Sequence, residues 1–220
     1  MAVPIAISHE KLIGALAGDL KPVKPLRKFA RQALVWFGVV AVLAGLLALL
    51  ADLPDMAARL TAAPDMWLAM TGAALTAILG AIAAFQLALP DRKPWWALLP
   101  LPGLALWLGA SGLGCLRTVI EMGTYEEIIG ESKDCLVFIL AVSVPLSAAL
   151  IILLRRGYSL APSLTALTAG IAAAGAAVAL LNFIHPHDPS VIGIAVHGVG
   201  VAIVVIANRI MGGRIFSAGA

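Results

Sequence analysis

The chain has little charge. Charged residues make up 12% of its 220 residues, whereas hydrophobic residues make up 61%. A water-soluble domain of this size needs far more polar surface to cover its core. The composition therefore excludes a soluble globular fold.

The sequence also lacks the motifs of the common catalytic and nucleotide-binding sites. It contains no Ser-His-Asp arrangement, HExxH helix, P-loop or glycine-rich dinucleotide loop in its proper context. Such sites need these residue types at fixed spacing on defined elements. We predict that the protein is not an enzyme and needs no cofactor.

Six long apolar runs account for most of the chain. Each run has about 20 residues, the length that a helix needs to cross the hydrocarbon core of a bilayer. We predict an all-α membrane protein with six transmembrane helices, at residues 33–53, 66–89, 96–115, 136–154, 163–183 and 193–211.

The basic residues sort onto alternate sides of these runs. If the N-terminus is cytoplasmic, only Arg59, Arg117 and Lys133 fall in outside segments. Lysine and arginine are retained on the cytoplasmic side, so the pattern predicts that both termini lie in the cytoplasm. The net charge of +3 then reflects orientation and contact with anionic inner-leaflet lipids, and it gives no support for nucleic-acid binding.

The first 31 residues contain no apolar core of a cleavable signal peptide, so the first span is expected to be its own insertion signal. We divide the chain into a cytoplasmic segment at 1–31, a transmembrane domain at 32–212 and a cytoplasmic tail at 213–220.

No Asp, Glu, Lys or Arg falls in the middle of any predicted span. Coupled transporters and proton pumps carry such groups at midplane, so their absence argues against this class. The polar residues that the spans do hold, among them Ser143, Ser147 and Asn208, are explained by hydrogen bonds between helices. A facilitator for a neutral solute remains open.

The spans are rich in small residues, notably at 79–84 and 170–177. Small residues let helix backbones approach closely within a membrane. They serve packing within one chain or across a homodimer, and the sequence leaves the homodimer open.

The two cysteines are Cys115, at the end of the third predicted span, and Cys135, at the start of the fourth. The predicted topology places both near the outer surface, where a disulfide or a thiol sensor is possible. The alternative is two small apolar residues packed at helix ends. The segment between them carries five acidic residues and is expected to be a solvated loop with a short interfacial helix rather than a metal site.

A second polar cluster contains His185 and His187, followed by His197 about a turn inside the last span. Two nearby histidines suit zinc binding or pH sensing. The alternative is an ordinary turn, because the cluster contains Pro186 between its histidines and Pro189 two residues after the second.

The N-terminal segment is the largest part of the chain expected outside the membrane. Ser8 is placed to cap a helix over residues 9–20, on which Leu12, Ile13, Leu16 and Leu20 form an apolar stripe. Pro22 then ends the helix. A helix this short is marginal alone in water, so we expect it to lie on membrane lipids or in the groove of a partner.

Several short motifs occur in a characteristic order. Before the first span stand Leu12-Ile13, Leu16, Asp19-Leu20, Pro22-Val23 and Pro25-Leu26; Cys135 precedes a span with Pro145; Arg155-Arg156-Gly157 and Pro162 open the fifth span; Asn182-Phe183-Ile184-His185 closes it. In this order and topology, the chain resembles the bacterial six-helix membrane anti-sigma factors, the family named for the negative regulator of sigma F.

The resemblance implies that the N-terminal segment sequesters an extracytoplasmic-function sigma factor until a stress signal arrives. The implied binding residues are Leu12, Ile13, Leu16, Asp19, Leu20, Pro22, Val23 and Leu26.

The resemblance also implies sensing by outer-face cysteines. Cys135 matches the first family cysteine, but Pro186 occupies the position of the second. A disulfide between those two positions is therefore excluded here, and Cys115 or His185 is left as the candidate companion of Cys135.

Two other function classes stay open. A small facilitator or metal-responsive permease would use His185, His187, His197 and the acidic loop as an entry site. A subunit of a larger membrane complex would use the small-residue faces as its interface.

Overall fold

The computed structural model describes residues 8–18, 29–62, 64–122, 128–155, 157, 159–184 and 191–217. The elements in chain order are α1 (His9–Gly18), α2 (Phe29–Leu50), α3 (Leu53–Ala62), α4 (Pro64–Leu87), the 3-10 helix η1 (Pro94–Leu98), α5 (Leu101–Met122), α6 (Ile128–Leu154), α7 (Pro162–Leu181) and α8 (Val191–Ser217). All elements in these ranges are helical, as the sequence predicts.

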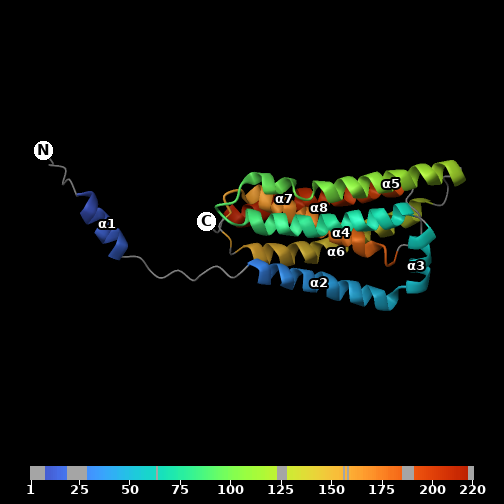
Figure 1. Cartoon of the computed structure of the whole chain (residues 1–220), viewed down its shortest axis with the longest axis horizontal. Coiled ribbons are helices and arrows are strands. Elements are labelled where there is room, and N and C mark those ends of the chain that lie inside the picture. Colours follow the sequence, from blue (N-terminus) through green and yellow to red (C-terminus); the bar gives the residue numbers. More distant parts are fainter. Residues whose placement is uncertain are drawn as a thin grey trace.

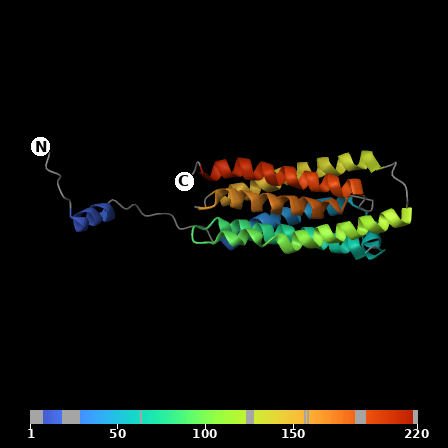
Figure 2. The same cartoon turned by 90° about the horizontal axis from the view of Figure 1, so that it is seen from above.

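Within the described residues, six segments are long and apolar enough to cross a membrane, and each overlaps one predicted run. They are Ala30–Leu50, Pro64–Leu87, Pro94–Leu116, Asp134–Leu154, Pro162–Leu181 and Gly193–Gly212. The helices run side by side as a long bundle, and α1 lies apart from it (Figures 1 and 2).

Helix α7 forms the centre of the bundle and packs against α4, α6 and α8, while α5 packs against α4. Its small residues make this possible: a Cβ atom added at Gly175 would lie 2.9 Å from the backbone nitrogen of Ala77, and one at Gly80 would lie 3.0 Å from that of Ala172. The small-residue runs at 79–84 and 170–177 therefore pack helices within one chain.

Asn208 and Ser147 join two helices, as expected, whereas Ser143 does not: its hydroxyl is buried and has no hydrogen-bond partner. The Asn208 side chain on α8 donates a hydrogen bond of 2.9 Å to Ser147 Oγ on α6. The carbonyl of Leu87, at the end of α4, accepts hydrogen bonds from Ser159 Oγ (2.8 Å) and Thr165 Oγ1 (3.1 Å). These bonds fix the turn between α6 and α7 onto the end of α4.

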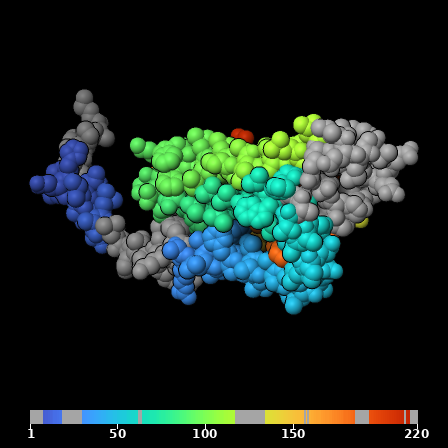
Figure 3. Space-filling view, turned by 45° about the vertical axis from the view of Figure 1, so that its right-hand side comes forward, coloured from blue at the N-terminus to red at the C-terminus, as the bar shows by residue number. Residues whose placement is uncertain are grey.

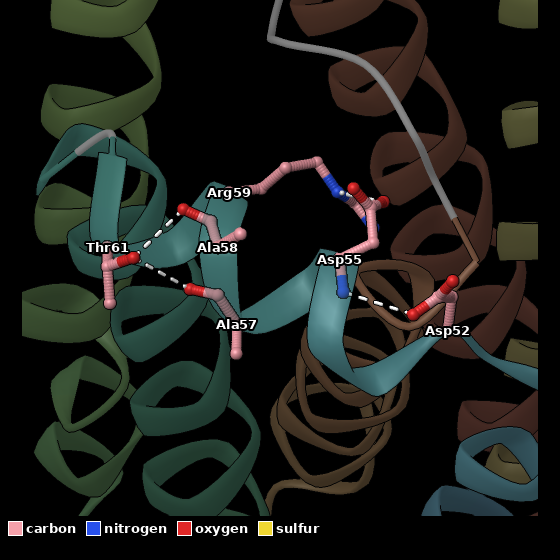
Figure 4. A network of polar contacts seen from close by, with 6 residues as sticks. All are labelled: Asp52, Asp55, Ala57, Ala58, Arg59 and Thr61. Carbon is pink, nitrogen blue, oxygen red and sulfur yellow. Dashed lines mark hydrogen bonds and ion pairs between the residues drawn. The ribbon is translucent and has the colours of Figure 1, made fainter.

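The structure adds a helix that the sequence analysis did not predict, α3, which lies across one end of the bundle (Figure 1). Asp52 caps it, since its side chain accepts a hydrogen bond of 3.1 Å from the Asp55 backbone N–H. Asp55 also pairs with Arg59 at 3.0 Å, and the Thr61 hydroxyl donates to carbonyls one turn earlier (Figure 4). Met56 is buried and anchors α3 on the bundle. We name this end of the bundle the α3 end.

Candidate functional site

Helix α1 presents an exposed apolar surface. Leu12 is 46% exposed, Ile13 64% and Leu16 63%, and no residue of α1 is buried. Residues spaced by one, three and four positions lie on one side of a helix, so these three form a continuous patch. Such a patch suits docking into an apolar groove or onto lipid. We call Leu12, Ile13 and Leu16 the α1 stripe.

Ser8 lies at the N-terminus of α1: the Lys11 backbone N–H donates to Ser8 Oγ at 3.4 Å, and that of Leu12 donates to the Ser8 carbonyl at 3.1 Å. The described helix ends at Gly18. The other predicted partner-binding residues, Asp19, Leu20, Pro22, Val23 and Leu26, lie outside the described residues, so their part in the site stays a prediction.

The two cysteines differ in burial. Cys135, near the start of α6, is only 5% exposed and lies in a core cluster with Ile139, Ala177 and Val178. Cys115 on α5 is half-buried. Both are thiols in the structure. Because α5 packs mainly on α4 whereas α6 packs on α7 and α8, the two thiols belong to different helix pairs.

The histidines are only partly described. His185 and His187 lie outside the described residues, and His197 is half-buried on α8. Helix α8 packs along α6, where a Cβ atom at Gly200 would lie 3.1 Å from the Leu136 side chain. His197 therefore lies one turn from the seam that the start of α6 forms with α8. Within the described residues, no group of three or more His, Cys, Asp and Glu side chains could hold a metal ion.

The burial of the cysteines predicts their reactivity. In the full chain in lipid, a membrane-permeant thiol reagent is expected to modify Cys115 at least about tenfold faster than Cys135, since reaction at a buried thiol first requires local opening. Mass spectrometry of the two tryptic peptides over time measures both rates, with Cys115→Ser and Cys135→Ser as controls. Equal rates would contradict the burial of Cys135.

A small cavity lies between α4, α5, α7 and α8. It is lined mostly by apolar residues, including Leu104, Trp107, Ile171 and Val178, and its volume is about 10 Å³. That is room for roughly one water molecule. The cavity is too small to serve as a solute path.

The described residues are helical, with six helices long and apolar enough to cross a membrane and a separate exposed helix before them, which is the architecture of a multi-pass membrane protein. The chain belongs to the family described as negative regulator of sigma F, whose family model matches residues 16–217. The match begins within α1, includes Leu16 of the α1 stripe and extends through α8. No curated protein and no solved structure matches the chain.

Membership of this family implies negative regulation of a sigma factor, and therefore a sigma factor as the partner. It confirms the family resemblance that the sequence motifs indicated.

Proposed function

We propose that the chain is a membrane-bound anti-sigma factor that holds an extracytoplasmic-function sigma factor on its cytoplasmic N-terminal segment and releases it on an external signal. The family supports the regulatory role. The observation that carries the binding site is the α1 stripe, which is the exposed apolar surface of the one described helix that stands outside the bundle.

The distribution of charge supports this orientation. The described residues at the α3 end include Asp52, Asp55, Arg59, Asp65 and Asp134. The opposite end, where α2 begins and α8 ends, carries one described acidic residue, Asp91, and these basic residues: Arg31, Arg92, Lys93, Arg155, Arg209 and Arg214. Since basic residues favour the cytoplasmic side, we assign the opposite end and α1 to the cytoplasm, in the bacterial inner membrane.

Retention of the sigma factor at the membrane would keep it from RNA polymerase. Basic residues at the cytoplasmic end favour contact with anionic lipids, which would keep α1 near the membrane surface when no partner is bound. Binding by the α1 stripe removes the three apolar side chains from water, and this burial supplies the driving force.

For sensing, we propose a two-state mechanism in which chemistry at Cys135, with Cys115 or His185, shifts helix packing. The buried position of Cys135 between α6 and α7 suits this role, because a modified thiol no longer fits a close-packed core. A Cys135→Ser variant is expected to repress normally yet to lose most of its response to the inducing stress. A reporter of the sigma factor measures this. Unchanged induction of the reporter would contradict the thiol mechanism and leave the proposed anti-sigma function intact.

Co-purification tests the function itself. The full-length tagged chain, solubilised from native-host membranes, is expected to bring down one sigma factor as its main soluble partner. Recovery of membrane proteins alone would contradict the proposal and favour an assembly subunit.

A further inference from the structure

Helix α2 is the helix that leads from the N-terminal segment into the bundle, and it is weakly held there. Only 6% of its span is buried, against 78% for α7 and 50% for α4. Its outward side exposes large apolar residues, with Leu34 at 71% and Leu49 at 82%. Figure 3 shows α2 in blue on the outside of the bundle, continuing into α3 in cyan.

One large side chain anchors α2. Trp36 is fully buried and belongs to the same core cluster as Ala81, Phe85 and Leu150. Its indole N–H donates a buried hydrogen bond of 3.1 Å to the backbone carbonyl of Leu146 on α6. A buried indole N–H needs a hydrogen-bond partner. Trp36 has this partner and fills its pocket only while α2 is docked on α6.

Trp36 contacts α6 directly after the proline of that helix. Leu146 follows Pro145, the proline inside α6. Because proline has no N–H, the helix lacks one backbone hydrogen bond just before the carbonyl that Trp36 contacts. Cys135 lies 11 residues earlier on the same helix, about 16 Å along its axis. Helix α6 therefore joins the buried thiol to the anchor of α2.

We propose that Trp36 acts as a latch: its contact with Leu146 keeps α2 docked on α6. Loss of this contact lets the cytoplasmic half of α2 move away from the bundle. The capped helix α3 holds the other end of α2, so motion is largest where α2 leads to α1. The claim that this motion changes how the α1 stripe is presented to a partner rests on the proposed function. The claim that Trp36 keeps α2 docked does not rest on it.

Two spin labels measure docking in the full chain. We place them at Leu34→Cys on α2 and Ile152→Cys on α6, both exposed and both near the end opposite α3, in a Cys115→Ala, Cys135→Ala background in lipid nanodiscs. The chain with Trp36 is expected to give one main distance. Trp36→Ala is expected to add a population longer by about 10 Å, the width of a helix. Trp36→Phe, which loses only the N–H and part of the ring, is expected to add a smaller one.

Trp107→Ala is the matched control, because Trp107 is 8% exposed but packs in the other core cluster. It is expected to leave the distance distribution unchanged. A distribution that Trp36→Ala does not alter overturns the latch. A second population of equal size in Trp107→Ala also overturns it, since the effect would then be general loosening.

The consequence for regulation is measured separately in cells that carry the original cysteines. Trp36→Ala is expected to raise unstimulated sigma-dependent transcription about tenfold, and Trp36→Phe at equal membrane abundance is expected to raise it less. A lengthened distance with unchanged transcription overturns the link between the latch and α1. Failure of the unaltered chain to capture any sigma factor contradicts the proposed function alone, because the distance measurement needs no partner.

Discussion

Changing Leu12 and Leu16 together to aspartate is expected to weaken capture of the sigma factor by at least about 100-fold. Each leucine is roughly half exposed or more, so its burial in a partner's groove is worth about 2 kcal/mol, and an aspartate there adds a desolvation cost. Titration of the sigma factor onto the nanodisc-embedded full chain measures the affinity.

The matched control places the same two charges on the other side of α1. Gly14→Asp with Gly18→Asp lies away from the α1 stripe, and a Cβ atom added at either glycine would meet no side chain and no other element within 4 Å. This variant is expected to bind the sigma factor with an affinity within a few-fold of that of the unaltered chain. Equal weakening by both pairs would mean that net charge, rather than the stripe, governs binding.

The second large effect is expected at the α4–α5 contact. A Cβ atom at Gly72 would lie 2.4 Å from the Trp107 backbone nitrogen, and one at Gly103 would lie 2.6 Å from that of Thr76. Two helix backbones thus meet without room for any side chain. Gly72→Leu is expected to cost at least about 3 kcal/mol, a large part of a typical stability margin, and to reduce sharply the yield of folded protein. Size-exclusion profiles and thermal unfolding in detergent measure this.

Gly109→Leu is the control for that substitution. Gly109 lies on α5 as well, but no atom approaches a Cβ there within 4 Å. The variant is expected to fold with the yield of the unaltered chain. If Gly72→Leu and Gly109→Leu behave alike, α5 does not pack on α4 as described.

The long helices could be predicted because length and hydropathy alone define them. The first predicted span, 33–53, is displaced by about one turn from the observed Ala30–Leu50. Its start lies earlier because Gln32 is polar yet buried, and its end lies earlier because Asp52 caps the next helix. Helix α3 was missed because it is short and amphipathic and therefore gives no long apolar run. Asp52 followed by Asp55 was the available signal, since an aspartate before a helix caps its first turn.

The candidate sites likewise combine features that the local sequence predicts with features that depend on helix packing. The capping by Ser8 and the exposure of the α1 stripe follow from local sequence, and the structure agrees. The burial of Cys135 depends on which helices pack beside α6, and a sequence pattern does not contain this information. The anchoring role of Trp36 was missed for the same reason. This role depends on the hydrogen-bond acceptor of the indole N–H, which lies 110 residues away in the chain.

The central claim is that the α1 stripe touches a sigma factor in the cytoplasm. Photo-crosslinking in living cells tests it most directly, with a benzophenone amino acid at Ile13, which is 64% exposed beside Leu12 and Leu16, and at Gly14 on the opposite side as control. We predict a covalent adduct with one sigma factor from position 13, lost on induction and weak or absent from position 14. Adducts only with lipids or membrane proteins from position 13, in cells where the sigma factor is present, would contradict the account.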